Sequence, residues 1–223
     1  MSEHEQAANA VIASEAKQLS HGPVNQSWIA SSLRSSQMTV ETPPPEYVMK
    51  VIGLAGWSGA GKTTLLTRVI PQLQRQGLRV SVIKHAHHAF DVDVPGKDSW
   101  RHREAGAAEV LVSSSQRWAL MHELRGAAEP RLPELLARMS SVDLVVVEGF
   151  KREPHRKIEV HRAANGKPLL FPDDPGIVGI ATDTAVETKL PTAHLDDIEA
   201  VAAMMLKSAI SLEDVMAKCK AEG

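Results

Sequence analysis

Short apolar runs separated by polar segments recur along the chain from about residue 47 onward. Residues 48–55, 78–84, 144–147 and 177–181 are rich in aliphatic and β-branched side chains, which is typical of buried strands. The uninterrupted run at 144–147 predicts a parallel strand that is covered on both faces. Residues 157–161 instead alternate between polar and apolar, and this pattern predicts a strand at the edge of the sheet.

Segments with helical spacing alternate with these strands. Two shorter apolar runs, at 109–113 and 117–121, predict further strands that pair as a hairpin. The alternation predicts an α/β fold, with a mostly parallel, twisted sheet flanked by helices and a small edge hairpin. The predicted helices cover residues 64–70, 98–103, 133–139, 197–206 and 211–219.

The first part of the chain differs from the rest in composition. Residues 1–46 are rich in Ser, Gln, Ala and Glu and end in the stretch Thr42-Pro-Pro-Pro45, which is typical of a stiff spacer. We therefore predict two parts: a mostly disordered N-terminal tail at 1–46, and a nucleotide-binding domain at 47–223.

The strongest motif is Gly56-Trp-Ser-Gly-Ala-Gly61-Lys62-Thr63, which fits the G-x-x-x-x-G-K-[ST] spacing of a P-loop between a predicted strand and a predicted helix. Its glycines let the backbone approach a phosphate, and its N–H groups and the helix start attract anions. We expect Lys62 to reach the β- and γ-phosphates and Thr63 to offer its hydroxyl to Mg²⁺. The domain is thus predicted to be a P-loop NTPase. The expected nucleotide-binding set is Gly56, Ser58, Gly59, Ala60, Gly61, Lys62, Thr63 and Thr64.

An acid follows the clearest interior strand. Glu148 comes directly after the run at 144–147, at the carboxyl end of that strand, where ligands bind in open α/β sheets. We expect Glu148 to support the Mg²⁺ site together with Thr63, directly or through water. Asp98 is the alternative acid for Mg²⁺. Lys62, Glu148 and Asp98 are therefore the candidate catalytic residues.

The segment from Lys84 to Ser99, which we call the histidine loop, follows the second predicted strand and also opens on the ligand edge. Three interpretations stay open: contact with nucleotide or substrate, metal binding by the histidines, or a solvated loop. Arg101, Arg103 and Lys151 are the cations nearest these elements in the sequence, and any of them could neutralise charge in phosphoryl transfer. The two arginines could instead lie on a solvated helix face. The candidate substrate or switch residues are His85, His87, His88, Asp91, Asp93, Lys97, Asp98 and, after Glu148, Lys151.

The base of the nucleotide is harder to assign. The Asn-Lys-x-Asp guanine signature of many GTPases is absent from the sequence. Asp183 follows the strand at 177–181, and its carboxylate could accept hydrogen bonds from N1–H and N2–H₂ of guanine, which adenine does not match. Asp183 is therefore a hypothesis for guanine recognition.

Composition narrows the class of protein. The 223 residues carry a formal net charge of −2 with both signs interspersed, which argues against a broad nucleic-acid surface. Cys219 is the single cysteine, so we expect neither an internal disulfide nor a cysteine-based zinc site. The sequence has no signal-peptide pattern and no apolar stretch long enough to cross a bilayer, so we predict a cytoplasmic protein with no membrane contact.

These motifs together resemble the MobB family, the molybdopterin-guanine dinucleotide biosynthesis adaptor proteins. The resemblance runs from about Met49 to about Asp183, and the histidine loop makes it specific, because a bare P-loop would leave many families open. The residues that carry it are Gly56 to Thr63, Lys84-His85-x-His87-His88-x-Phe-Asp91-x-Asp93-x-Pro-Gly96-Lys97-Asp98-Ser99, Arg103-x-Ala-Gly106-Ala, Gln116-Arg117-Trp118-Ala-Leu, and Val147-Glu148-Gly149-Phe-Lys151.

The resemblance implies a protein that binds GTP with Mg²⁺, hydrolyses it weakly and forms homodimers. It implies as partners the guanylyltransferase MobA, which joins GMP to molybdopterin, and the molybdopterin itself. On this interpretation Lys62 and Thr63 carry phosphate and Mg²⁺, Glu148 supports the metal, and the histidine loop lies near the nucleotide or the cofactor.

Three other functions remain open at this point. A small-molecule kinase would use the same loop, with Arg101 or Arg103 over the transferred phosphate. A metallochaperone GTPase would use His85, His87 and His88 to deliver a metal. A nucleotide-binding scaffold would show no meaningful turnover.

Overall fold

The computed structural model describes residues 48–86 and 90–221. All of them belong to one unit, Pro45–Gly223. The predicted tail at 1–46 lies outside the described residues, as do His87 and His88. The prediction of a disordered tail and of a boundary at residue 47 therefore stays a prediction.

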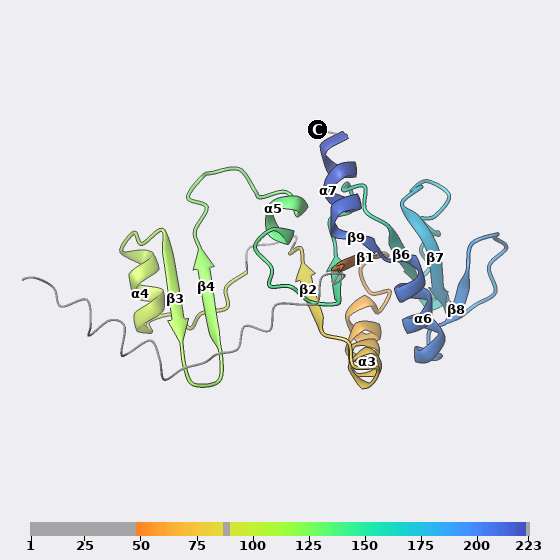
Figure 1. Cartoon of the computed structure of the whole chain (residues 1–223), viewed down its shortest axis with the longest axis horizontal. Helices are drawn as coiled ribbons and strands as arrows, with labels where there is room; N and C mark the ends of the chain where they lie inside the picture. The colour runs from red at the N-terminus through yellow and green to blue at the C-terminus, as the bar shows by residue number, and fades with distance from the viewer. Residues whose placement is uncertain (1–47, 87–89, 222–223) are drawn as a thin grey trace, which may run out of the picture. The chain divides into compact units, whose positions relative to one another are not determined.

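The core of the unit is a seven-stranded sheet, in which six strands follow the order β2-β5-β1-β6-β7-β8. These six strands are parallel, and β9 (Ile210–Ser211) pairs antiparallel with the start of β1. The mostly parallel sheet that the apolar runs predicted is confirmed (Figure 1). The strands are β1 (Lys50–Ala55), β2 (Val80–Lys84), β5 (Leu144–Glu148), β6 (Lys157–His161), β7 (Ile177–Thr182) and β8 (Thr192–His194).

Helices cover both faces of this sheet. Because successive strand residues point to opposite faces, Ile52 and Leu54 pack in one apolar cluster and Val51 packs in the other. The first cluster contains α3 (Lys62–Arg75) and α6 (Ile198–Ser208). The second contains α5 (Leu132–Leu136) and α7 (Leu212–Ala221), and Figure 1 shows these two pairs on opposite sides of the sheet.

The prediction of an edge strand at 157–161 is wrong. β6 lies in the interior of the sheet, between β1 and β7. Its two charged residues are buried but paired: Lys157 Nζ lies 3.2 Å from Asp174 Oδ2. The Glu159 carboxylate accepts the backbone N–H groups of Leu170 and Phe171, at 2.7 and 2.9 Å. A polar residue within a strand therefore marks a buried pair here, and not a solvent-facing side.

Two other features differ from the sequence-based expectation. The helix predicted at 64–70 continues through Pro71 to Arg75, because Pro71 lies on the exposed side, where water can satisfy the carbonyl that loses its partner. The short strands β8 and β9 and the 3₁₀ turn Ala163–Asn165 were not expected, because segments of two or three residues carry no measurable periodicity.

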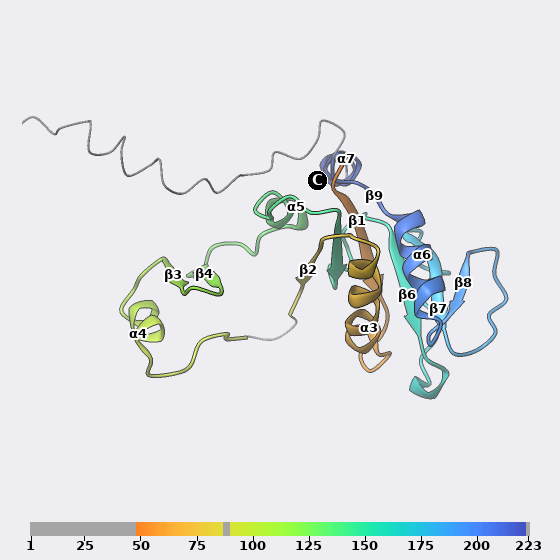
Figure 2. The ribbon, with the colours of Figure 1, turned by 60° about the horizontal axis from the view of Figure 1, so that its bottom comes forward.

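The expected hairpin forms a second, two-stranded sheet of β3 (Glu109–Ser113) and β4 (Trp118–His122). The short helix α4 (Asp98–Glu104) packs on β3 (Figure 2). Leu111 lies directly opposite Leu120, and Trp118 opposite Ser113, so these side chains share one face. That face is exposed. Within the residues described, no helix has the length and apolarity needed to span a bilayer.

Candidate functional site: a phosphate loop at the carboxyl edge of the sheet

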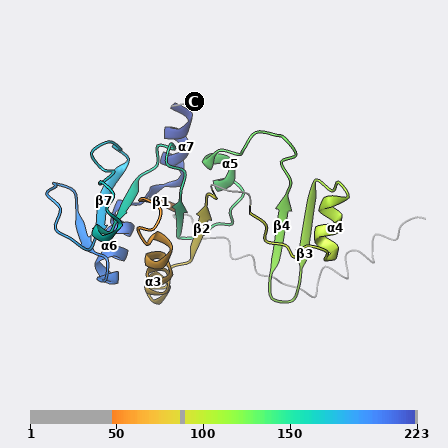
Figure 3. The same ribbon diagram turned by 180° about the vertical axis from the view of Figure 1, so that it is seen from behind.

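The phosphate loop, residues 56–63, joins the end of β1 to the start of α3 (Figure 3). Gly56, Gly59 and Gly61 have φ values of 141°, 82° and 90°, which side chains rarely adopt. A Cβ on Gly56 would also lie only 2.5 Å from the carbonyl oxygen of Val160. Gly61 precedes the first residue of α3, and no side chain caps the helix. The N–H groups at the helix start are thus left for an anion.

Lys62 lies over this loop. Its Nζ donates to the carbonyl oxygens of Gly56 and Trp57, at 2.8 and 3.0 Å. Burial lowers the pKa of Lys62, Glu148 opposes that shift, and Lys151 and Lys84 add to it. An ammonium that is partly desolvated and close to other cations gains most from a polyanion.

Thr63 and Glu148 meet at the same edge. The Thr63 hydroxyl donates to Glu148 Oε1 at 3.0 Å, and Glu148 is only 8% exposed. Glu148 ends β5, beside Leu54 of β1 and Lys84 of β2, and Lys84 Nζ lies 3.8 Å from its Oε2. A hydroxyl and a carboxylate are hard oxygen donors, so this pair fits Mg²⁺ beside bound phosphates.

Two residues at this site were missed in the sequence. Asn165 Nδ2 donates to the carbonyl oxygen of Ser58 at 3.0 Å. The guanidinium of Arg162 lies 3.7 Å from where a Cβ on Gly61 would stand. Arg162 directly follows β6 and Asn165 ends the 3₁₀ turn that comes next, and a carboxyl strand end is a signal for ligand contacts. Because residues 157–161 were predicted to form an edge strand, the end of that strand was not expected to lie beside the phosphate loop.

Asp183 contacts the segment that follows β6. One carboxylate oxygen accepts the Ala163 N–H at 2.8 Å, and the other lies 3.5 Å from Arg162 Nη1. Asp183 also lines a cavity of about 400 Å³ at the carboxyl ends of β7 and β8, together with Thr182, Thr184 and His194. We call this space the Asp183 cavity.

The histidine loop is described only in part. His85 Nε2 lies 2.7 Å from Glu129 Oε1, and the His85 ring packs against Phe150 with centroids 4.8 Å apart. His87 and His88 lie outside the described residues. Within the ranges 48–86 and 90–221, no three His, Cys, Asp or Glu side chains form a group that could hold a metal ion. Lys97 is exposed, whereas Lys151 reaches the phosphate loop, with its Nζ 5.8 Å from the centre of the Trp57 ring.

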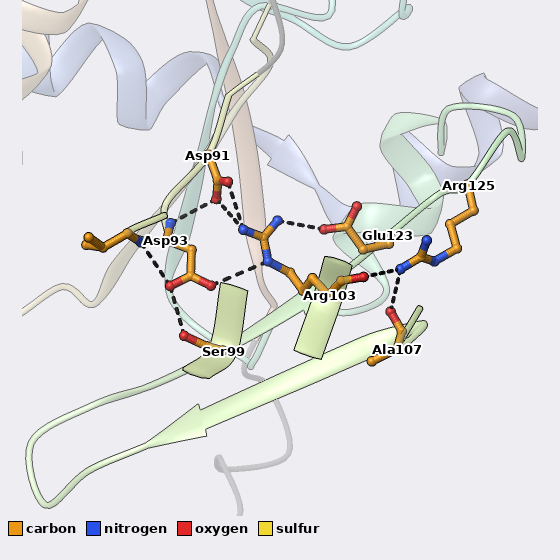
Figure 4. Close-up of polar contacts among 8 residues, drawn as sticks. Asp91, Asp93, Ser99, Arg103, Ala107, Glu123 and Arg125 are labelled. Atoms are coloured by element: carbon orange, nitrogen blue, oxygen red, sulfur yellow. Dashed lines mark hydrogen bonds and ion pairs between the residues drawn. The ribbon is translucent and has the colours of Figure 1, made fainter. Parts of the chain in front are cut away.

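Asp91 and Asp93 bind Arg103 (Figure 4). Both oxygens of Asp91 accept from Arg103 Nη2, and this lowers the pKa of Asp91. Asp93 Oδ2 lies 3.4 Å from Arg103 Nε, and Glu123 Oε1 accepts from Nη1 at 2.8 Å. We call Arg103 with these three acids the carboxylate cluster. Its bonds tie the loop to α4 and to the segment after β4.

These contacts change how two predicted residues, Arg103 and Asp98, are interpreted. Arg103 is committed to three carboxylates, which argues against its use as an arginine finger. Asp98 is exposed as the first residue of α4, where it makes no side-chain cap. In the part of the chain that the structure describes, the carboxylate bonded to Thr63 is that of Glu148. Lys62, Thr63 and Glu148 therefore come together, and Asp98 stays an unsupported alternative.

Comparison with known proteins identifies the family of this chain. A family model described as "Molybdopterin guanine dinucleotide synthesis protein B" matches residues 51–183. The molybdopterin-guanine dinucleotide biosynthesis adapter protein of Escherichia coli K12 is 42% identical over 158 residues, 70% of this chain and 90% of that protein. The protein of the same name from Haemophilus influenzae is 42% identical over 156 residues, 68% and 85% of the two chains.

The fold agrees as well. A crystal structure described as molybdopterin-guanine biosynthesis protein B superimposes with a TM-score of 0.56 at 28% identity, over 70% of this chain and 97% of that one. The family model covers more than half of the chain, and the two relatives match it over most of their own lengths. The chain belongs to the MobB family.

Proposed function

We propose that this chain is a GTP-binding adaptor protein with weak GTPase activity, which assists the attachment of GMP to molybdopterin. Its relatives are named adapter proteins of molybdopterin-guanine dinucleotide biosynthesis. The observation that carries the nucleotide part is the Thr63–Glu148 hydrogen bond at the mouth of the glycine-built phosphate loop. It supports a site for a triphosphate with Mg²⁺.

In this proposal the phosphates lie on the phosphate loop between Lys62 and Arg162. Lys62 exchanges its bonds to Gly56 and Trp57 for bonds to the β- and γ-phosphates. Arg162 approaches from the β6 side and neutralises further charge. Mg²⁺, held through Thr63 and Glu148, supplies charge neutralisation when bound.

We propose that guanine occupies the Asp183 cavity. Because one oxygen of Asp183 is already bonded to Ala163, the other would accept from the base after Arg162 turns toward the phosphates. The test compares the affinities of Asp183→Asn and the parent for GTP and for ATP. We expect the preference for GTP to fall by roughly tenfold. An unchanged preference would remove Asp183 from base recognition.

We also propose that the chain forms a homodimer through the hairpin. Leu111, Leu120 and Trp118 are 60%, 47% and 67% exposed on one face of the two-stranded sheet, and such a hairpin is marginal in water by itself. Sedimentation velocity should show a dimer for the parent and a monomer for Leu120→Asp. Val48→Asp, at an exposed apolar residue outside the hairpin, should stay dimeric. A dimeric Leu120→Asp would place the interface elsewhere.

Three kinetic and binding outcomes separate this function from its alternatives. A kinase would consume nucleotide in proportion to a phosphorylated acceptor, whereas the adaptor should release phosphate slowly without one. A metallochaperone would retain stoichiometric metal that a triple His→Ala variant of His85, His87 and His88 loses. A scaffold would bind GTP without any release of phosphate.

The decisive experiment is a pull-down with a MobA-like guanylyltransferase and a molybdopterin assay, each with GTP, GDP and ATP. We expect capture and stimulation with GTP, and weaker effects with GDP and ATP. Capture that is independent of nucleotide, with no stimulation, would contradict the proposed function.

A further inference from the structure

A cavity of about 440 Å³ lies beyond the carboxyl ends of β2 and β5. The Asp183 cavity lies beyond β7 and β8, and the phosphate loop after β1 separates the two. If the phosphates sit on the loop and the base in the Asp183 cavity, this first space is left for a second ligand. We call it the Phe150 pocket. Its lining includes His85, Glu129, Arg131, Phe150, Lys151 and Arg152.

The aromatic wall of the Phe150 pocket is fixed by a strained turn. Phe150 has φ 49°, a value that bulky residues rarely adopt, and it follows Gly149 with φ 100°. A Cβ on Gly149 would lie 2.6 Å from the Cβ of His85, so only glycine permits this close approach. The turn holds the Phe150 ring against the His85 ring, 4.8 Å between centroids. The result is a preformed aromatic surface next to Glu148.

Some of the charged side chains at the pocket form ion pairs within the described part of the chain and others do not. Glu129 binds His85 at 2.7 Å, and Glu153 lies 3.5 Å from Arg131. Lys151 and Arg152, by contrast, are exposed and form no ion pair with any residue that the structure describes. The pocket therefore offers two cations to an anion, while the carboxylates of Glu129 and Glu153 that line it can accept hydrogen bonds from ring N–H groups.

We propose that the Phe150 pocket is a second ligand site, for a planar nitrogen heterocycle that carries a phosphate, and that its ligand is a phosphorylated pterin. The ring lies along Phe150, its N–H groups face Glu129 or Glu153, and its phosphate meets Arg152 and Lys151. A guanine nucleotide shares this chemistry, but the phosphate loop and the Asp183 cavity already provide for one. This choice of ligand rests on the proposed function.

The two sites are joined through the chain. Glu148, which bonds Thr63, is two residues from Phe150, and Lys151 lies beside the Trp57 ring of the phosphate loop. In this proposal, a ligand bound in one site therefore changes the electrostatic field and the packing in the other site. Linkage requires the effect to be reciprocal, so GTP should change pterin affinity by the factor by which pterin changes GTP affinity.

The test is a fluorescence titration of the full chain with 6-hydroxymethylpterin phosphate, with GMP as the competing arm. We expect saturable one-to-one binding that Arg152→Ala weakens at least about tenfold. Arg156→Ala is the matched control, since Arg156 is exposed, lies four residues further on and does not line the pocket. It should bind pterin as the parent does. GTP affinity, measured separately by calorimetry, should stay unchanged in Arg152→Ala.

Several results would overturn the inference. They are the absence of pterin binding by a chain that still binds GTP, equal pterin affinity in Arg152→Ala and the parent, and displacement of pterin by GMP at equal concentration. Phe150→Leu offers a second check that preserves folding better than a polar change, and an unchanged pterin affinity there would also count against the site. Pterin binding without GTP binding would instead support the pocket and contradict the proposed GTP-binding function.

Discussion

The phosphate loop and the histidine loop both begin where a parallel strand ends at the same edge of the sheet, but they use their polar groups in opposite ways. The phosphate loop is built from backbone, and the N–H groups at the start of α3 have no side-chain cap. In the histidine loop, Asp91 and Asp93 contact Arg103. A high density of charged residues therefore indicates a scaffold here, and unpaired backbone donors indicate the site.

The carboxylate cluster explains why the second loop needs so many charges. A guanidinium that is largely shielded from water needs several partners, and Asp91, Asp93 and Glu123 supply them from two sides of α4. Arg125 adds bonds to the carbonyl oxygens of Arg103 and Ala107, at 2.6 and 3.0 Å (Figure 4). The cluster thus replaces an apolar core for a helix with no buried residue.

The largest effect on nucleotide binding should follow loss of Lys62. Lys62→Ala removes the charge partner of the β- and γ-phosphates and should cost about 2–4 kcal/mol of triphosphate binding, roughly a 30- to 1,000-fold rise in Kd. Calorimetry with GTP measures it. Lys97→Ala, in the histidine loop, is the matched control and should change little. Equal losses in the two variants would erase the contrast between the loops.

The pH dependence of binding gives a second view of Lys62. Burial, then the neighbouring cations, lower the pKa of Lys62 in the free protein, and a bound polyanion raises it. Affinity for GTP should therefore be full below the free-state pKa and fall as pH rises through it. The fall should begin at lower pH than an ordinary lysine would give, and Lys62→Ala should lack it.

A stability effect of similar size should come from His155, beneath the phosphate-loop strand. Its ring is fully buried against Gly53, without a well-aligned hydrogen-bond partner, and burial followed by the charge of Lys157 lowers its pKa to about 4. The unfolded chain, with a His pKa of about 6.5, binds a proton that the folded chain does not.

The free energy of unfolding should therefore rise with pH between about 4 and 6.5. The contribution of neutral His155 is fully present above that window, and up to about 3 kcal/mol of it is lost below the window. Urea denaturation across this range measures it. Because leucine does not titrate, the free energy of unfolding of His155→Leu should depend less on pH in this range. The same slope in variant and parent would show that His155 accepts its proton without cost.

A smaller effect should follow from Glu148. Glu148→Gln keeps an oxygen for the Thr63 hydroxyl but removes the charge that attracts Mg²⁺. We expect the factor by which Mg²⁺ strengthens GTP binding to be about 10–100 times smaller in this variant than in the parent. Without Mg²⁺ the variant should bind GTP as well as the parent or better, because a negative charge has left the phosphate site.

Asp98→Asn is the control for the metal. Asp98 belongs to the helix that the carboxylate cluster holds, so its variant should keep the full Mg²⁺ response. The reverse outcome, a response lost in Asp98→Asn and kept in Glu148→Gln, would move the metal to the other loop.

The same contrast explains what the sequence could predict. The glycine spacing, Lys62, Thr63 and Glu148 lie within short segments whose own strand and helix patterns place them, so local reasoning was enough. Asn165 contacts Ser58 across 107 positions, and that contact depends on β6 lying beside β1. Strand order is set by packing between distant elements, which an apolar run does not encode.

Arg103 is a second case in which contacts between distant elements could not be predicted from the sequence. Its arginine type and its place near the ligand edge suggested catalysis, while its partners Asp91 and Glu123 lie 12 and 20 positions away. Both contacts join different elements of the chain, so no local periodicity in the sequence indicated the cluster. Only the folded structure shows that Arg103 is already paired with carboxylates.

The smallest effect on nucleotide binding should come from that arginine. Arg103→Met keeps much of the side-chain length but leaves Asp91, Asp93 and Glu123 without their cation. We expect the melting temperature to fall by several degrees and proteolysis to reach the loop and α4 sooner, while GTP affinity stays within about twofold of the parent. Arg101→Met, on the exposed side of α4, should change neither quantity. If Arg103→Met folds with its stability intact but loses GTP binding or phosphate release, Arg103 leaves its carboxylates when nucleotide arrives. The histidine loop would then be a second part of the phosphate site, held closed in the free protein.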